Sequence, residues 1–541
     1  MKRIYFLLGF LFAIAFGSVM GQTTNTEYFV SSSYTRTNLN PALRPARGYV
    51  GIPGVSNILV DYKTNAFNLE NFVFPGKGEN GKAVTFLHPD ISAGEFLKNI
   101  SANNYLALDF NLTVLGFGFY VGDAFVSFDL SPRIISNFNV PKGLFSFIKE
   151  VGGDHEFTDM SMTMAAIAQA GVGFSYPVLN KSLVLGGKVK VLAGLGAAGF
   201  NIDRLQLNFG ENRWTMRSQA TIQMYAPGVE FKYKEDGTFD NNIKMDNFKP
   251  ELSGFGLGFD LGATFQPGKY FVDVFTDNYE FLNNFTVSAA VTDIGYINWN
   301  KKNLQAVGTV DSDEITILGD GQFDFQDEDN KIEDVFTDVT DKIIDAMQLK
   351  EVENPAQMRG IGLTAKMNWG LDYAFSNFPA NLGFFTSTRF TPVETITDFT
   401  FGGAIRPIRN LTWVELGLSY SLLTGGMANF EQFGVSLHLG NFFFISSDYL
   451  MPKVNKDFLP VSIKGLNVQL GLSIPLRGPR SGRQSEPKED LSMPHRPGIE
   501  RRLPPEPTTQ PATQAPPQVV QPPTQVTGNP NREQSDPNRQ P

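Results

Sequence analysis

Ser436 and His438 lie two residues apart in a segment where apolar and polar side chains alternate, so both fall on one face of the expected strand. A serine and a histidine that share a face are two members of the triad of serine hydrolases, which also needs a carboxylate or amide. The sequence indicates no third partner for this pair. It contains no Gly-x-Ser-x-Gly elbow, phosphate loop or His-Glu-x-x-His run. We therefore expect no enzyme and no cofactor.

A second candidate is the acidic stretch 311–341, which has twelve Asp or Glu and a single basic residue, Lys331. Five of its carboxylates could gather around calcium or magnesium: Asp324, Asp327, Glu328, Asp329 and Glu333. The spacing lacks the glycine and the final Glu of the twelve-residue calcium loop. A solvated acidic loop is the alternative, and whether a metal binds stays unknown.

Isolated charged residues form a third group, because they interrupt segments of alternating large apolar side chains. Lys188 and Lys190 are the clearest case, and Asp260, Glu415 and His438 occupy equivalent positions in other segments. Alternation puts successive side chains on opposite faces of a strand. We expect these five side chains to face the lumen of a barrel, as pore-lining or structural groups.

The segments that carry these residues have long period-two patterns. Apolar and small or polar residues alternate over 106–114, 254–266, 414–422 and 465–476. Soluble strands usually have five or six residues, whereas a tilted strand needs nine to eleven to cross a bilayer. The pattern predicts an all-β fold, a transmembrane antiparallel barrel. A soluble sandwich is the alternative.

Composition supports the same class. The chain has 541 residues, 48 Phe, 52 Gly, no Cys, 18% charged residues and a net charge of −10. The absence of Cys excludes disulfides and thiolate sites, and the acidic balance argues against nucleic acid as a partner. A Phe- and Gly-rich chain with few charges suits strands with one face against lipid.

Both ends of the chain differ from the middle. Residues 1–21 have a basic start, an apolar stretch and small residues before Gln22, as in a secretory signal peptide. The last 64 residues, 478–541, hold 15 of the 33 prolines and few large apolar side chains, which predicts a disordered tail. No segment after the signal peptide has the roughly 20 apolar residues of a membrane helix.

Connections between the expected strands alternate between short and long. Short turns are expected near 121–123, 179–181, 210–213, 378–381, 407–410 and 440–441, and long ones near 64–104, 138–160, 225–253, 300–358 and 450–462. Outer-membrane barrels have short periplasmic turns and long external loops. The pattern gives a count of sixteen strands, uncertain by two, between Tyr49 and Leu476.

Short motifs add a resemblance. Asn40-Pro41-Ala42 after the signal peptide resembles the long-chain fatty acid transporter superfamily of outer-membrane barrels. Together with Gly51-Ile52-Pro53-Gly54, and with 171–176 followed by 186–190, it is similar to a Bacteroidota barrel family of unknown function (DUF5723) over about residues 25–476. The transporters have fourteen strands and an N-terminal plug. The resemblance therefore implies 14–16 strands, a plug or linker at 22–48 with Asn40, Pro41 and Ala42 as its motif, and a barrel at 49–477.

Two functions fit these expectations. The resemblance implies an outer-membrane protein that binds or passes small hydrophobic molecules, surrounded by lipid and lipopolysaccharide. The alternative is an interaction protein, which would act as a secretion-machine partner or as an envelope tether through its tail. The tail would then lie in the periplasm and meet a periplasmic or cell-wall partner.

The tail generates a first test. Residues 478–541 have too few apolar side chains to offset an ordering cost of about 1–2 kcal/mol per residue, so their deletion should leave barrel assembly and melting unchanged. Heat-modifiable migration on gels measures both. A large loss of folded barrel would show that the tail belongs to the fold.

Overall fold

The computed structural model describes residues 23–479, apart from 79–80, 150–152, 210–213, 245–250, 272–276, 310–314, 319–346, 359–360, 391–394, 408–412, 426–428 and 450–464. The expected signal peptide, the tail beyond residue 479 and the carboxylates from Asp324 to Glu333 lie outside the described residues. The chain divides into two units, 1–497 and 498–541, and the fold below is that of the first.

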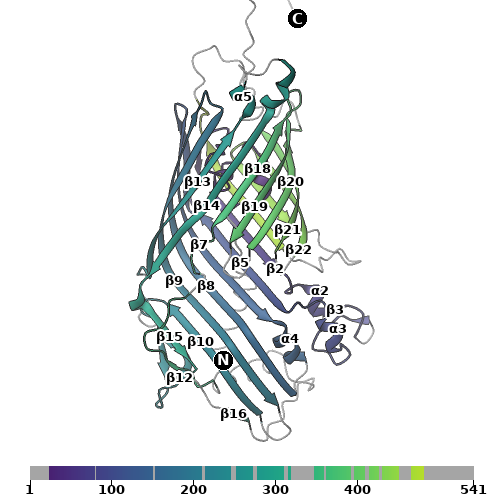
Figure 1. Cartoon of the computed structure of the whole chain (residues 1–541), viewed down its shortest axis with the longest axis vertical. Coiled ribbons are helices and arrows are strands. Elements are labelled where there is room, and N and C mark those ends of the chain that lie inside the picture. The colour runs from purple at the N-terminus through teal and green to yellow at the C-terminus, as the bar shows by residue number, and fades with distance from the viewer. Residues whose placement is uncertain are drawn as a thin grey trace, which may run out of the picture. The chain divides into compact units, whose positions relative to one another are not determined.

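Fourteen antiparallel strands close into a barrel (Figure 1). Two of the fourteen are interrupted, so that β1 continues into β2 and β5 into β6. In chain order the barrel elements are β1 (Tyr49–Gly51), β2 (Asn57–Thr64), β5 (Asn103–Thr113), β6 (Leu115–Val121), β7 (Ala124–Pro141), β8 (Gly153–Val178), β9 (Leu183–Phe209), β13 (Gly254–Phe265), β14 (Phe285–Trp299), β18 (Lys366–Ala374), β19 (Ala380–Phe390), β20 (Thr395–Ile405), β21 (Val414–Thr424), β22 (Asn429–Leu439), β23 (Phe443–Tyr449) and β24 (Gly465–Pro475).

Each strand in this order pairs with the next, and β24 pairs back with β1 and β2 to close the ring. At one end of the barrel, here the short-turn end, β6–β7, β8–β9, β18–β19 and β22–β23 are joined by tight turns. The first two turns include Gly122 at φ 61° and Asn180 at φ 53°, residue types that tolerate the left-handed region. The opposite end is the long-loop end.

A sheet continues beyond the barrel at the long-loop end. Past Gly194 the partner of β9 changes from β13 to β10 (Trp214–Tyr225), which pairs in turn with β15 (Leu304–Gly308) and β16 (Ile315–Leu318). Figure 1 shows β8, β9 and β10 running on past the other strands. The fourteen strands fall at the lower end of the expected 14–16, because the patterned segments around 202–224 belong to this extension, where β9 and β10 pair with each other outside the ring. The short turn expected near 210–213 lies outside the described residues.

The long connections also hold more regular structure than expected, since β7 runs to Pro141 and β8 starts at Gly153 within the predicted loop 138–160. The remaining strands are β3 (Val73–Phe74), β4 (Val84–Thr85), β11 (Glu230–Tyr233), β12 (Phe239–Lys244) and β17 (Lys350–Glu351). The helices are η1 (Asn25–Tyr28), η2 (Thr35–Asn38), α2 (Leu69–Phe72), α3 (Ala93–Leu97), α4 (Lys142–Lys149), α5 (Pro267–Phe271), η4 (Asp277–Asn284) and η5 (Lys301–Asn303).

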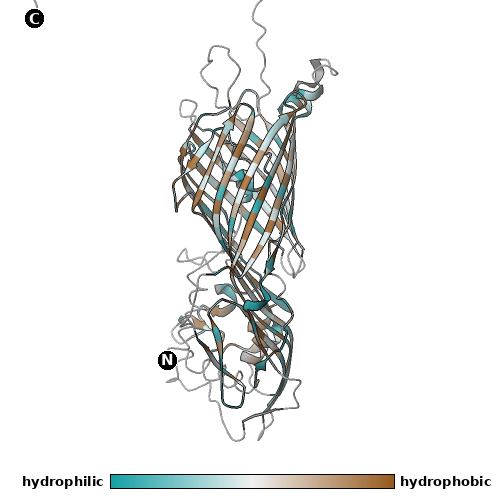
Figure 2. Cartoon of the chain, turned by 90° about the vertical axis from the view of Figure 1, so that its left-hand side faces the viewer, coloured by the Kyte–Doolittle hydropathy of each residue, from teal (hydrophilic) through white to brown (hydrophobic). Residues whose placement is uncertain are grey.

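Side chains alternate between the two faces of the wall as the sequence pattern requires. On β13, Phe255, Phe259 and Leu261 are 55%, 43% and 60% exposed on the outside, whereas Asp260 and Thr264 are buried inside. Figure 2 shows hydrophobic residues recurring along the barrel strands in the same way. Among the described residues no helix is both long and apolar enough to span a membrane.

The outer face generates a second test. Phe259 lies near the middle of β13 on the outside, so Phe259→Arg should cost about 2–4 kcal/mol if that face meets lipid near the bilayer midplane. Phe255→Arg, on the same face at the end of the same strand, should cost about 0–1 kcal/mol. Urea unfolding in vesicles, followed by gel migration, gives the free energy of unfolding of both variants. Equal costs would contradict the lipid-facing assignment.

Candidate functional site

The first component inside the barrel is the N-terminal segment, residues 23–48. Its residues are mostly buried, and the rings of Tyr28 and Phe29 pack with Phe385 of β19. Because no long regular element forms here, the backbone N–H groups of this segment need partners from elsewhere.

Two wall carboxylates supply those partners. Asp448 of β23 accepts the backbone N–H groups of Asn25 and Thr26, and Glu415 of β21 accepts those of Ser31 and Ser32. Each carboxylate thus receives two consecutive amides, a charge-assisted arrangement that fixes both the position and the direction of the backbone.

A third anchor joins Glu27 to β22. The Glu27 carboxylate accepts a hydrogen bond from Ser436 Oγ at 2.5 Å and lies 3.0 Å from His438 Nε2. Glu27 is the carboxylate partner of Ser436 and His438 that sequence analysis did not indicate, because it lies 411 residues earlier in the chain than His438. Both side chains are directed at Glu27, so this cluster ties the N-terminal segment to the wall.

The motif residues Asn40, Pro41 and Ala42 lie against β13, β14 and β9. Asn40 Nδ2 donates to the carbonyl oxygens of Ala263 and Ala289 at 3.1 and 3.2 Å, and its Oδ1 accepts from Ala42 N. A Cβ atom on Gly262 would overlap Asn40, and one on Gly186 would overlap the backbone of Pro41. Gly256 of β13 is required for a different reason, because a Cβ atom there would meet the backbone of β14.

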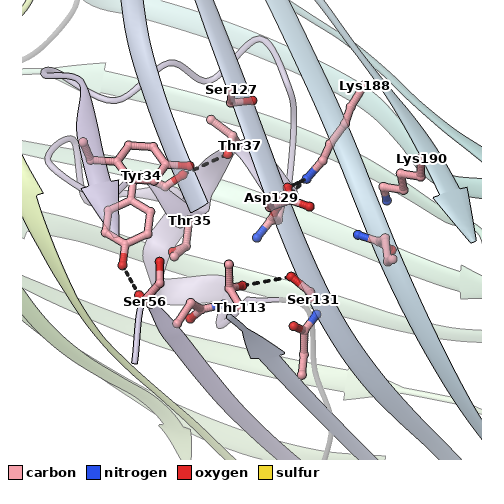
Figure 3. A pocket seen from close by; sticks show the side chains of 15 residues that line it. Tyr34, Thr35, Thr37, Ser56, Thr113, Ser127, Asp129, Ser131, Lys188 and Lys190 are labelled. Carbon is pink, nitrogen blue, oxygen red and sulfur yellow. Dashed lines mark hydrogen bonds and ion pairs between the residues drawn. The ribbon is translucent and has the colours of Figure 1, made fainter. Parts of the chain in front are cut away.

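Between the N-terminal segment and the wall lies a small polar cavity of about 30 Å³ (Figure 3). Lys188 and Asp129 form an ion pair at its edge, while Ser127, Ser131 and hydroxyls of the segment line it. A buried water needs about 10–15 Å³, so the cavity has room for two or three waters and not for a larger solute.

The next level along the barrel is a ring of charged side chains, which we call the charge belt. It comprises five bases and five acids: Lys63, Arg133, Lys190, Lys366, Arg389, Asp61, Asp109, Asp260, Asp293 and Asp398. Its members come from β2, β5, β7, β9, β13, β14, β18, β19 and β20. Equal numbers of opposite charges allow every charge to be compensated where water is scarce.

Asp293 is the best connected member of the belt. Lys190 Nζ lies 2.5 Å and Arg133 Nη1 3.4 Å from its carboxylate, and its backbone N–H donates to Asp260 at 2.7 Å. It has φ 58°, and the β13–β14 register shifts beside it, as in a bulge that redirects a side chain. Sequence analysis missed Asp293, although a signal exists: the outward apolar positions change from odd to even between Val291 and Ile294.

Beyond the belt the inner wall becomes apolar. Ile135, Ile167 and Leu192 form a buried cluster, and Ala165, Ala197, Tyr225, Trp299 and Ile361 form an adjoining one; together we call them the apolar layer. Leu363 packs on the first cluster and Met358 on the second. Trp299 Nε1 donates to the Ile361 carbonyl at 3.2 Å, which satisfies the indole inside this apolar region.

The five lumen candidates and the three motif residues therefore do not form one site. Lys190 and Asp260 pair at 2.7 Å in the belt, and Lys188 borders the cavity. Glu415 and His438 bind the N-terminal segment. Asn40, Pro41 and Ala42 belong to that segment and lie against the wall. All five lumen candidates are buried. Within the described ranges, no cluster of three or more His, Asp or Glu could hold a metal ion.

A closed antiparallel barrel with an apolar outer face and a polar interior is the architecture of an outer-membrane-type β-barrel. The chain belongs to the family of unknown function DUF5723, which matches residues 41–448. This confirms the family indicated by the motifs. A comparison with curated protein sequences gives no match.

Solved structures include similar barrels. The toluene transporter TbuX of Ralstonia pickettii is 9% identical, with 85% of this chain and 95% of that chain covered and a TM-score of 0.37. A Pseudomonas aeruginosa FadL homologue is 11% identical, with 84% and 99% covered and a TM-score of 0.37. The Pseudomonas putida toluene transporter TodX is 10% identical, with 84% and 94% covered and a TM-score of 0.34.

The close approach of Pro41 generates a third test. Gly186→Ala should destabilise the protein by about 1–3 kcal/mol, because the new methyl group overlaps backbone that cannot move aside. Gly187→Ala is the matched control: it faces outward, and its Cβ would have no neighbour nearer than 3.7 Å. The temperature midpoint of unfolding, read from heat-modifiable migration on gels, measures the stability of both variants. Equal midpoints for the two variants would show that the N-terminal segment does not press on β9.

Proposed function

We propose that this chain is an outer-membrane barrel that binds a small, largely apolar molecule at its long-loop end, as a step in passing such molecules across the membrane. The observation that carries the proposal is the apolar layer. Inward positions nearer the short-turn end are mostly small, polar or charged, and aromatic exceptions such as Phe125, Phe385 and Phe444 lie in clusters with the N-terminal segment. Beyond the belt, β7, β8, β9 and β14 present Ile, Leu and Trp inward.

The chemistry of the apolar layer suits such a ligand. Tyr225 and Trp299 lie with ring centroids 5.3 Å apart beside aliphatic side chains, and a few polar groups fix orientation at its edge. Small-molecule sites are mostly apolar and aromatic with a small number of placed polar groups. Ile361 and Leu363 cover this wall, and we propose that the ligand takes their place against it.

The orientation of the barrel in the membrane can be inferred from the difference between its short-turn end and its long-loop end. Short turns face the periplasm and long loops face outward in outer-membrane barrels. We propose the same orientation here, with the apolar layer towards the exterior and the predicted tail in the periplasm. Residues 23–48 would act as the plug, held by Asp448, Glu415 and Glu27. The tethering alternative rests on the tail, of which only residues 478–479 are described.

Binding can be measured with the apolar fluorophore N-phenyl-1-naphthylamine. Leu192→Asn places an amide without a hydrogen-bond partner in the apolar layer. Covering this amide with an apolar ligand should cost about 1–3 kcal/mol of binding free energy, which corresponds to about 5- to 150-fold weaker binding. The control is Leu185→Asn, on the outer face of the same strand, which should bind like the unmodified protein. Fluorescence titration of protein shown to be folded by heat-modifiable migration gives the affinities. Unchanged affinity in Leu192→Asn would contradict the proposal.

A further inference from the structure

We propose that the charge belt is a second closure of the lumen, which blocks the barrel axis independently of the N-terminal segment. The proposal concerns ions and polar solutes as well as apolar ones, and it does not require that any molecule bind to the apolar layer.

The ion pair of Arg389 with Asp61 is the first reason. Arg389 Nη1 lies 3.7 Å from Asp61 Oδ2, although β19 and β2 are separated in the ring by five strands, β20 to β24, on the shorter side. Six steps along the wall at about 4.8 Å each make roughly 29 Å. The two side chains therefore meet across the lumen and not along the wall.

A second ion pair crosses the lumen between other strands. Arg133 of β7 lies 3.4 Å from Asp293 of β14, with β8, β9 and β13 between them in the ring. Arg133 also pairs with Asp109 on the neighbouring strand β5 at 3.3 Å. Lys366 of β18 is attracted electrostatically by Asp293 and Asp109, so it adds a positive charge to the second crossing.

The belt resists opening because its charges are buried together. Arg133 and Asp293 are 3% and 0% exposed, and Arg389 and Asp61 are 18% and 8% exposed. Separating one crossing pair would take an ion-pair partner from each of two buried charges, which is less favourable than separating an exposed pair. The inward turn of Asp293 at the bulge holds one of these charges in place.

The belt also lies between two different environments. Along β7, Ser131 of the polar cavity, Arg133 of the belt and Ile135 of the apolar layer follow one another at every second residue. An apolar molecule on the layer would have to displace paired charges to continue along the axis. Removal of the N-terminal segment alone should accordingly leave the barrel closed.

Ionic conductance in planar lipid bilayers containing potassium chloride tests this directly. The variant lacking residues 23–48 should show no steps above the protein-free background. Adding Asp61→Ala with Arg389→Ala and Arg133→Ala with Asp293→Ala removes both crossings at no net change in charge, and this combined variant should conduct in discrete steps. The four substitutions with residues 23–48 retained should stay closed.

The matched control is Asp129→Ala with Lys188→Ala in the shortened chain, because that ion pair borders the cavity and belongs to neither crossing. It should remain closed. If the deletion prevents folding, Glu27→Ala with Asp448→Ala loosens the segment instead and the same comparison is made. Conductance from the folded variant without an intact N-terminal segment, while the belt is intact, would overturn the proposal. So would a folded combined variant that stays closed.

Discussion

Closing fourteen strands into a ring encloses every second side chain, and an enclosed charge without a partner is costly. This constraint explains most of the interior. The belt balances five bases with five acids, and two further wall carboxylates, Asp448 and Glu415, accept backbone amides of the N-terminal segment. In return, a segment with no long regular element gains partners for its amides. The wall and the N-terminal segment therefore depend on each other.

The same constraint orders the interior into levels, which can be followed along β9. Gly186 leaves room for Pro41, Lys188 borders the cavity, Lys190 enters the belt, and Leu192 begins the apolar layer. An apolar molecule meets a compatible surface only at the last of these levels. In the proposed function, the charges beneath it would separate binding at the long-loop end from movement along the axis. A barrel of this kind can take up a molecule at one end without being an open pore.

Much of the wall could be predicted from the sequence, because the alternation of apolar and polar residues indicates which face of each strand is enclosed. The alternation of apolar and polar side chains along β9, β13 and β21 placed Lys190, Asp260 and Glu415 on the inner face. Partners could not be predicted, because contacts across a lumen join residues hundreds of positions apart, such as Glu27 and His438. The expected strand count ranged from fourteen to sixteen because alternation continues outside the ring, and period-two patterns do not distinguish a barrel strand from its extension. The bulge at Asp293 breaks the alternation, so a prediction that assumes one constant alternation along each strand misses its inward side chain.

Hydrogen–deuterium exchange of the detergent-extracted protein tests the mutual dependence most directly. The amides of Asn25, Thr26, Ser31 and Ser32, which donate to the two wall carboxylates, should exchange as slowly as those of the barrel strands. If these four amides exchange at the rate of an unstructured peptide while the strands stay protected, the N-terminal segment is not held by the wall and the account is contradicted.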